Sequence, residues 1–258
     1  MRDKVLKESN SVRALEVEGL EFSYTGYQKV LGGVDLEIGC GERVGLIGPN
    51  GAGKTTFFLV VCGVLKATAG EVKLFGHPVS SGLFNPDVGM VFQKPDDQLF
   101  CPSVWEDVAF GPLNMGLDPD EVEGRVARAM AVTGIRELAE RPVHHLSEGE
   151  KRLVTIACVL AMESAMILYD EPSASLDIRS RRRLISLLQK SEETLLIASH
   201  DLELILEVCS RVILLDRGKI VADGDPRKIM ADEVLMEAHG QERPHSLVPH
   251  QIHHHQSA

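Results

Sequence analysis

Eight residues, from Gly48 to Thr55, have the types and spacing of a loop that binds phosphate (Gly-Pro-Asn-Gly-Ala-Gly-Lys-Thr). Glycines allow such a backbone to curl, so that successive N–H groups point at an anion, and the helix that follows contributes its positive N-terminal end. We expect Lys54 to reach the β- and γ-phosphates of a nucleotide and the Thr55 hydroxyl to hold Mg²⁺. The predicted nucleotide-binding residues of the loop are Asn50, Gly51, Ala52, Gly53, Lys54, Thr55 and Thr56.

A phosphate loop that performs chemistry also needs a carboxylate for the metal and a group that activates water. Asp170 and Glu171 follow an apolar segment predicted to be a buried strand, and open α/β sheets bind ligands at the carboxyl ends of such strands. We expect Asp170 to bind Mg²⁺ and Glu171 to act as the general base. Gln93 and His200 also end predicted strands; Gln93 could sense the metal or the γ-phosphate, and His200 could hydrogen-bond the γ-phosphate. Each alone fits a structural role, but together they favour a catalytic site with Thr55, Gln93 and Asp170 as Mg²⁺ ligands.

The segments around these residues alternate between apolar and polar side chains, as strands with one buried face do. Residues 15–22 and 34–38 predict two antiparallel strands joined by a polar turn at 25–29, and residues 43–48 predict a short buried strand before the loop. Tyr24 ends the first strand, where its ring could stack on adenine; the alternative is a tyrosine at the surface. Further strands are predicted at 71–75, 88–92, 165–170 and 194–200, with a final hairpin at 212–223.

Residues 95–162 differ from both flanks because their pattern predicts helices. Asp118 has the residue type and the neighbours of a helix start, and Ser147 with Glu150 fits a capping box. The charge run at 179–183 is expected to be only the solvated start of a helix. The predicted domains are a flexible N-terminus at 1–13, a nucleotide-binding domain at 14–232 with a helical subdomain at about 95–162, and a His-rich tail at 233–258.

The composition narrows the classes of partner. The chain has 258 residues, a net charge of −11, 44% hydrophobic and 25% charged residues, which is ordinary for a globular protein. The acidic balance argues against nucleic acid as a partner and against adhesion to anionic lipid. No apolar run approaches the ~20 residues that span a bilayer, and the N-terminus lacks the apolar part of a secretory signal, so we expect a cytoplasmic location. The five cysteines are scattered, which favours reduced thiols.

Together, these motifs resemble the ATP-binding subunit of an ABC transporter over about residues 14–232. The resemblance is carried by the phosphate loop, Gln93, Leu146-Ser-Glu-Gly-Glu150, Asp170-Glu171-Pro172, Ser173-Ala-Ser-Leu-Asp177 and Ser199-His200-Asp201. It implies the α/β class, with a RecA-like P-loop NTPase core, an antiparallel β subdomain and a helical signature subdomain. It also implies ATP hydrolysis by a head-to-tail dimer, with two ATP molecules held between the phosphate loop of one subunit and the signature helix of the other. Tyr24 would stack on adenine, Asp177 would couple the two sites, and the residues expected to contact ATP across the interface are Ser147, Gly149 and Glu150.

The signature differs from the Leu-Ser-Gly-Gly-Gln that is usual in this family, because Glu148 and Glu150 replace a Gly and the Gln. Glu150 still suits the capping box with Ser147. A carboxylate at position 148 repels a triphosphate unless it points away or is bridged by a cation. We therefore leave open the rate of turnover and whether the two sites of a dimer are equivalent. The expectation of ATP binding is unchanged.

The segment 93–100, followed by 104–116, resembles the ATPases of energy-coupling-factor transporters, which include cobalt and nickel importers. This resemblance implies a peripheral place at the cytoplasmic face of the membrane, where a transmembrane permease subunit presents helices to a groove. The residues expected to line the groove are Leu99, Phe100, Val104 and Trp105. Each of them could equally belong to the core. The dimer could pair two copies of the chain or two different ATPase subunits.

Five histidines near the C-terminus, at positions 245, 250, 253, 254 and 255, suit Co²⁺ and Ni²⁺, although a solvated tail without a ligand fits them as well. We therefore expect a cobalt or nickel importer, with a vitamin importer as the alternative. A soluble ABC-type ATPase that acts on DNA or ribosomes fits less well, because the sequence has neither a coiled-coil insertion nor a basic balance. A P-loop kinase would leave the signature and the paired acids unexplained.

Overall fold

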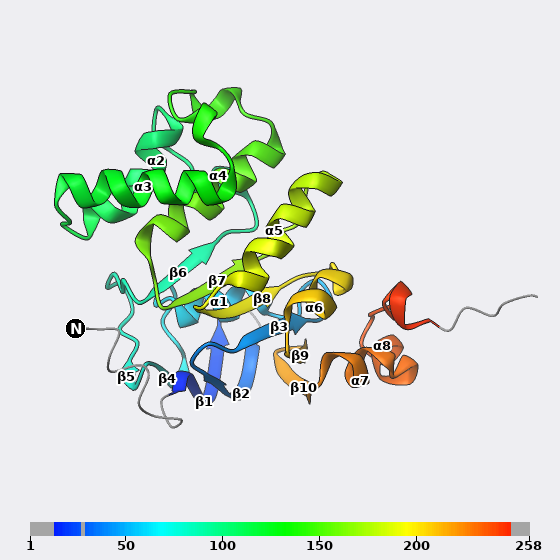
Figure 1. The fold of residues 1–258 in the computed structure, drawn as a ribbon. Coiled ribbons are helices and arrows are strands. Elements are labelled where there is room, and N and C mark those ends of the chain that lie inside the picture. Colours follow the sequence, from blue (N-terminus) through cyan, green and yellow to red (C-terminus); the bar gives the residue numbers. More distant parts are fainter. Residues whose placement is uncertain (1–12, 27–28, 249–258) are drawn as a thin grey trace, which may run out of the picture.

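The structure is a computed structural model that describes residues 13–26 and 29–248, which form two sheets and a separate group of helices (Figure 1). The larger sheet has the strand order β10-β9-β3-β8-β7-β6 and the smaller one the order β2-β1-β4-β5. The larger sheet contains β3 (Arg43–Ile47), β6 (Val88–Val91), β7 (Met166–Asp170), β8 (Thr194–Ala198), β9 (Arg211–Asp216) and β10 (Lys219–Gly224). The smaller sheet contains β1 (Arg13–Ser23), β2 (Lys29–Gly39), β4 (Ala69–Leu74) and β5 (His77–Pro78). The expected α/β fold with an antiparallel sheet and a helical part is confirmed.

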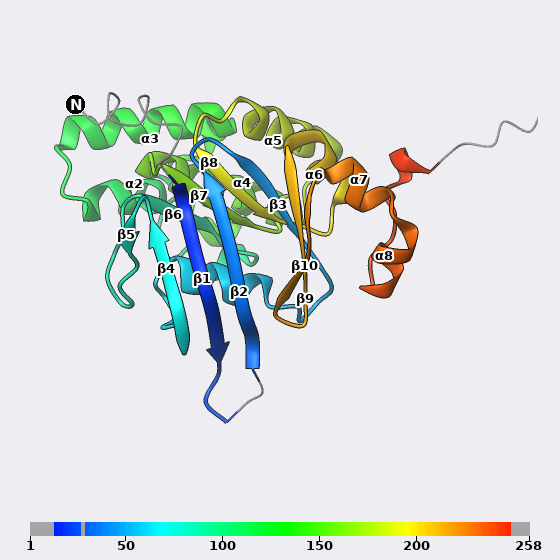
Figure 2. The same cartoon turned by 90° about the horizontal axis from the view of Figure 1, so that it is seen from below.

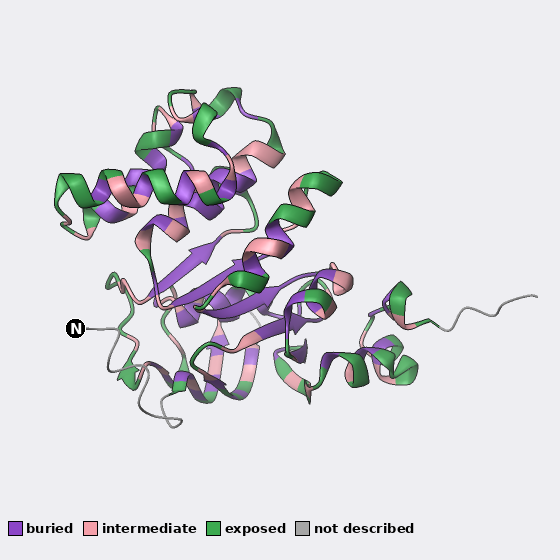
Figure 3. Ribbon diagram, in the orientation of Figure 1, coloured by how far each residue is buried: buried purple, intermediate pink, exposed green. Residues whose placement is uncertain are grey.

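The larger sheet is parallel except at β10, which pairs antiparallel with β9 at one edge. Both faces of its central strands are buried (Figure 3), as a parallel sheet requires. Side chains alternate between the two faces, so Leu196 and Ala198 of β8 enter one core cluster whereas Leu195 and Ile197 enter the other. The carboxyl ends of the parallel strands consequently meet at one edge of the sheet.

Helices and the smaller sheet cover the two faces of the larger sheet. On one face, Phe57 and Phe58 of α1 (Lys54–Val61) share a core cluster with Leu15 of β1 and Leu31 of β2. The strands β1, β2 and β4 lie side by side in Figure 2, and β1 pairs antiparallel with β2 as predicted. On the other face pack α4 (Glu148–Met162), α5 (Ile178–Lys190), α6 (Leu202–Val208), α7 (Pro226–Ala231) and α8 (Glu233–Ala238).

The helices α2 (Val104–Asn114), α3 (Pro119–Thr133) and α4 share a core of their own. Their starts agree with the sequence: Asp118 accepts a hydrogen bond from the Asp120 amide, and Ser147 forms the predicted capping box with α4. Leu99 and Val104 are buried in this core, at 7% and 0% exposure. The expectation that these two residues line a docking groove is therefore wrong, because their side chains fill the space between the helices instead.

The fold continues beyond residue 232, where we expected a tail. Met236 of α8 is fully buried against the larger sheet, and Nδ1 of His239 lies 2.8 Å from Oδ2 of Asp216 at the end of β9. These helices are too short to give a clear periodic pattern, which is why the sequence alone suggested a tail. Histidines 250, 253, 254 and 255 lie outside the described residues, as does the expected flexible N-terminus except for Arg13, which begins β1. Within residues 13–26 and 29–248, no helix combines the length and the hydropathy needed to cross a bilayer.

Met236→Ala should lower the free energy of unfolding by about 2–5 kcal/mol, because it removes a fully buried side chain from the core. Val234→Ala is the matched control, since Val234 lies on the same helix and is 79% exposed. Its truncation should change the stability by less than about 0.5 kcal/mol. Urea denaturation followed by circular dichroism measures both variants. Equal effects would contradict the packing of α8 on the core.

Candidate functional site

The carboxyl edge of the larger sheet borders a cavity of about 370 Å³. All predicted residues of the phosphate loop, from Asn50 to Thr56, line it together with Gln93, Asp170, Glu171 and His200. The loop follows β3, Gln93 follows β6, the two acids lie at the end of β7, and His200 follows β8. The strand order β3-β8-β7-β6 thus brings together side chains that are far apart in the chain.

The phosphate loop connects β3 to α1 through a backbone that needs glycine at two positions. Gly48 has φ 149° and lies so close to the carbonyl oxygen of Leu215 that a Cβ atom would not fit. Gly53, with φ 106°, adopts the left-handed conformation immediately before the helix begins. The loop therefore reaches the start of α1 in a few residues, and Lys54, Thr55 and Thr56 of the first helical turn line the cavity.

Lys54 lies inside this loop and is only 8% exposed. Its Nζ atom donates to the carbonyl oxygens of Gly48 and Pro49, at 2.6 and 3.2 Å. Burial lowers the pKa of Lys54, while the carboxylates of Glu171 and Asp170 act in the opposite direction. The ammonium group is thus already held at the cavity wall, where it can exchange a backbone carbonyl for a phosphate oxygen.

Thr55 and Asp170 join the phosphate loop to the end of β7. The Thr55 hydroxyl donates to Oδ2 of Asp170 at 2.6 Å, and Asp170 is 2% exposed. Burial raises the pKa of Asp170, although Thr55 and Lys54 oppose this shift. Two neighbouring oxygen donors suit a hard cation such as Mg²⁺, which takes one or two protein ligands and completes its shell with water and phosphate. Within the described part of the chain, no cluster of three or more His, Cys, Asp or Glu side chains could hold a metal by itself.

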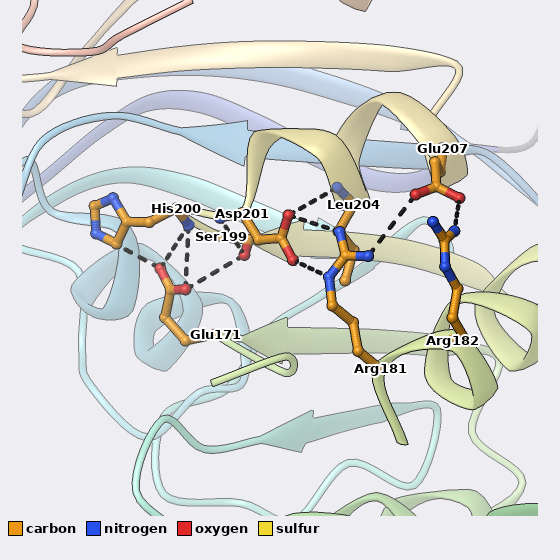
Figure 4. Close-up of polar contacts among 8 residues, drawn as sticks. All are labelled: Glu171, Arg181, Arg182, Ser199, His200, Asp201, Leu204 and Glu207. Carbon is orange, nitrogen blue, oxygen red and sulfur yellow. Dashed lines mark hydrogen bonds and ion pairs between the residues drawn. The ribbon is translucent and has the colours of Figure 1, made fainter. Parts of the chain in front are cut away.

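Glu171 projects into the cavity from a left-handed backbone position, with φ 52°. Both of its carboxylate oxygens accept from the His200 amide at 3.1 Å, and Oε2 accepts from the Ser199 hydroxyl at 3.3 Å (Figure 4). The His200 ring lies 3.6 Å from Glu171 and makes a 2.9 Å hydrogen bond through Nε2 with Oδ1 of Asn50. A left-handed non-glycine residue at a cavity is a feature of functional sites, because the surrounding contacts must offset its strain.

Arg152 is a residue of this region that the sequence analysis did not select. It is 2% exposed on α4, and its guanidinium donates to the carbonyl oxygens of Phe92, at 2.6 Å, and of Gln93. Burial lowers the pKa of Arg152, and the nearby Asp170 opposes this shift. The arginine thereby fixes the backbone at Gln93. In the sequence, the signal that could have identified Arg152 is its position directly before the apolar run that begins at Leu153.

The signature residues lie elsewhere. Among the described residues, the cavity lining does not include Ser147, Gly149 or Glu150, which form the start of α4. Glu148 is 59% exposed, and its carboxylate lies 3.5 Å from Nζ of Lys151. This contact offsets part of the negative charge that Glu148 adds to the signature, while Lys151 also pairs with Asp96 at 2.7 Å.

Tyr24 lies beside the phosphate loop rather than in the cavity wall. Its hydroxyl is 3.5 Å from Oγ1 of Thr56, and its ring meets the Phe22 ring edge-on with centroids 4.8 Å apart. Tyr24 is 43% exposed. The role of Tyr24 in stacking on adenine stays a prediction.

The arginine run at 179–183 is not merely a solvated helix start, as we had expected. Arg181 and Arg182 on α5 form ion pairs with Asp201 and Glu207 on α6 (Figure 4). Arg183 donates to the carbonyl oxygen of Thr133. These contacts arise because α5 and α6 pack together on the same face of the sheet, which local sequence cannot indicate.

Comparison with known proteins agrees with this geometry. Residues 31–174 match the family model described as ABC transporter. The chain is 54% identical over 234 residues to a protein of Synechocystis sp. named as an ABC transporter ATP-binding protein, which covers 91% of this chain and 82% of the relative. It is 44% identical to the energy-coupling factor transporter ATP-binding protein EcfA of Methanothermobacter thermautotrophicus, over 86% of this chain and 74% of that protein.

A solved structure of CbiO1 from Clostridium perfringens, part of the ABC transporter complex CbiONQ, is also similar. It has a TM-score of 0.76 and 34% sequence identity, and the match covers 88% of this chain and 94% of that one. The residues that match the family model include the phosphate loop, Gln93 and both acids at the end of β7. The family match thus covers the cavity lining except for Val30 and His200, which lie outside residues 31–174.

Asp170→Asn should raise the free energy of unfolding of the nucleotide-free protein at about pH 7, because burial raises the pKa of Asp170 and its ionisation opposes folding. The unfolded chain loses this proton first, so the penalty is absent at about pH 3 and grows as the pH rises through the folded-state pKa. Urea denaturation at both pH values measures the effect.

Asp177→Asn serves as the control with the opposite sign. Hydrogen bonds from Ser180 lower the pKa of Asp177, so its stabilising contribution is present at neutral pH and is lost as the pH falls. The variant should therefore be less stable than the wild type at about pH 7. A loss of stability in Asp170→Asn at neutral pH, relative to acid pH, would contradict the buried charge.

Proposed function

The chain belongs to the ABC transporter family and is an ATPase, and from this premise we propose that it is the motor subunit of an energy-coupling-factor importer for Co²⁺ or Ni²⁺. It would lie at the cytoplasmic face of the membrane, bound to a transmembrane permease subunit. Similarity to EcfA and to CbiO1, the latter part of an assembled complex, supports this type of importer. The choice of metal over a vitamin rests on the C-terminal histidines of the sequence.

One observation carries the importer proposal: the segment after β6 lies between two cavities. Gln93 lines the nucleotide cavity, whereas Gln98 and Phe100 line a second, apolar cavity of about 450 Å³. Gln98 also ties the segment together, because it accepts from the Phe92 amide at 3.1 Å and donates to the Thr155 carbonyl oxygen of α4 at 3.0 Å. A nucleotide that moves Gln93 would therefore move a wall of the apolar cavity as well.

The residues of the nucleotide cavity have distinct roles in hydrolysis. The loop amides and Lys54 hold the phosphates, His200 hydrogen-bonds the γ-phosphate, and Glu171 accepts a proton from the attacking water. Thr55, Asp170 and the side-chain amide of Gln93 would hold Mg²⁺. The ion would neutralise charge on the β- and γ-phosphates. The Ser199 hydroxyl and the His200 amide keep the Glu171 carboxylate directed into the cavity.

The active form in this proposal is a dimer of two copies or of two related ATPase subunits. Ser147, Gly149 and Glu150 lie at the start of α4 and, within the described chain, take no part in the lining of its own cavity. In the dimer they would complete the nucleotide site of the partner subunit across the interface. The exposed ring of Tyr24 would stack on the adenine of the nucleotide held by its own loop.

Glu171→Gln should lower the rate of ATP hydrolysis by about 100-fold or more, because the amide cannot accept the proton of water. ATP affinity should stay within about threefold of the wild type, since the amide oxygen can still accept from the His200 backbone. Phosphate release and equilibrium binding of ATP measure the two quantities. Wild-type turnover in this variant would contradict the role of Glu171 as the base.

Purification of ATP-bound Glu171→Gln protein from its native membrane, followed by mass spectrometry, tests the importer itself. A small membrane protein with several helices and metal-ligating histidines would support metal import. A vitamin-binding membrane subunit would instead assign the motor to vitamin uptake. Absence of a membrane partner, with ATP binding verified, would contradict the transporter proposal and favour an ABC-type ATPase that works without one.

The same purification locates the docking surface, which we place around the exposed residues Phe100 and Trp105, at 65% and 36% exposure. Phe100→Glu should reduce recovery of the membrane partner by about 10-fold, because it puts a charge into the apolar cavity. Val132→Glu is the control, since Val132 is 55% exposed on α3 and contributes nothing to the apolar cavity. Equal recovery with both variants would place the partner elsewhere.

A further inference from the structure

A bidentate ion pair outside the cavity joins Arg181 to Asp201 (Figure 4). Nε of Arg181 donates to Oδ2 of Asp201 at 2.6 Å, and Nη2 donates to Oδ1 at 2.9 Å. The two side chains are 23% and 25% exposed. A bidentate arginine–carboxylate pair with this geometry and partial burial restricts both partners far more than an exposed ion pair does.

Asp201 is the meeting point of three elements. Its carboxylate caps α6 by accepting from the Leu204 amide at 3.0 Å, and it also takes a hydrogen bond from Ser173, which follows the acids of β7. Burial of Asp201 opposes ionisation, but the hydrogen bonds from Arg181 and Leu204 outweigh it and leave the pKa below its ordinary value. The carboxylate is therefore charged and fixed in place.

The turn from Ser199 to Asp201 carries this fixed position to the base. The Asp201 amide donates to the Ser199 hydroxyl oxygen at 3.0 Å, so the hydroxyl hydrogen is free to point at Oε2 of Glu171, 3.3 Å away. In the same turn the His200 amide donates to both oxygens of Glu171. Each hydrogen bond that orients Glu171 from this side thus comes from a turn whose last residue is held by Arg181.

We propose that Arg181 is a positioning residue for the hydrolysis of ATP: by clamping Asp201 it holds the Ser199–Asp201 turn that aims the carboxylate of Glu171. The proposal rests on the proposed function of Glu171 as the general base. Arg181 is not among the described residues that line the cavity, and its side chain contacts Asp201 and, at 3.8 Å, Glu207 of α6, so it reaches Glu171 through the turn. Because α5 begins directly after Asp177, the aim of the base also depends on where the segment 173–177 places that helix.

Arg182 provides a control within the same helix. Its Nη1 atom lies 2.6 Å from Oε2 of Glu207, so it also joins α5 to α6 by an ion pair. Glu207 lies near the far end of α6, where it is also 3.8 Å from Arg181, and its polar contacts among the described residues do not include the Ser199–Asp201 turn. A general loosening of the two helices would lower kcat in both variants alike. A misplaced Glu171 carboxylate would lower kcat only in the Arg181 variant.

The test compares Arg181→Met with Arg182→Met in the purified full-length chain, with ATP-binding stoichiometry used to fix the active concentration. Arg181→Met should lower kcat by about 10-fold, because a displaced base loses much of its effect, and should leave the Kd for ATP within about twofold. Arg182→Met should leave both values within about twofold. Arg181→Lys should fall between Arg181→Met and the wild type, since lysine keeps the charge but loses the bidentate geometry.

A double-mutant cycle shows whether the pair acts as one unit. Asp201→Asn keeps an oxygen for the Leu204 amide and should lower kcat as Arg181→Met does, and the double variant should be no slower than either single one. If Arg181→Met does not fold, Asp201→Asn carries the comparison with Arg182→Met. Equal kcat in Arg181→Met and Arg182→Met, with Glu171→Gln inactive, would overturn this inference and leave the proposed function intact. Turnover in Glu171→Gln would overturn the proposed function itself.

Discussion

The hydrogen bond between Thr55 and Asp170 connects the phosphate loop to the end of β7, and the arrangement of the cavity depends on it. Both partners belong to segments with little freedom: Thr55 lies in the first turn of α1, and Asp170 is buried at 2% exposure. A buried carboxylate is unfavourable unless a positive charge or a cation lies close by. Lys54 is the positive group next to it. Asp170 and Lys54 therefore place opposite charges at the cavity, where the carboxylate suits a metal ion and the ammonium group suits a phosphate.

The second constraint is the adjacency of β7 and β8 in the parallel sheet. It places the turn after β8 directly beside Glu171, whose left-handed backbone directs the side chain toward that turn. Backbone amides and a hydroxyl, rather than long flexible side chains, then orient the carboxylate. Groups that the sheet already fixes lose little conformational entropy when they bind the Glu171 carboxylate. The carboxylate is therefore oriented before the substrate binds.

Two arginines extend this arrangement into the surrounding helices. Arg152 of α4 binds the backbone of Gln93, and Arg181 of α5 binds Asp201, the last residue of the turn that holds Glu171. In each case a residue of the cavity is connected to a helix whose first residues, Ser147 or Asp177, resemble motifs that face a partner subunit. The geometry thus links both sides of the cavity to surfaces where another subunit would act.

Much of the site follows from local sequence, because its determinants are local. The glycines of the phosphate loop need particular backbone angles, the caps at Asp118 and Ser147 need neighbours a few residues away, and strands buried on one or both faces show in their apolar patterns. The order in which Gln93, Asp170 and His200 follow strands also indicated that they meet at one sheet edge. The loop, the caps and the strands hold in the structure because each depends on a short stretch of chain, whereas the meeting of these three residues follows from the rule that parallel strands end at a common edge.

What the tertiary structure alone decided concerns pairs that are distant in sequence. Arg181 and Asp201 are partners because α5 and α6 pack on the same face of the sheet, and Arg152 reaches Gln93 because α4 crosses the end of β6. Leu99 and Phe100 are adjacent and both apolar, yet one is buried and the other is 65% exposed. An apolar side chain has the same tendency to leave water at either position, so only the packing of the helices determines which of the two is enclosed.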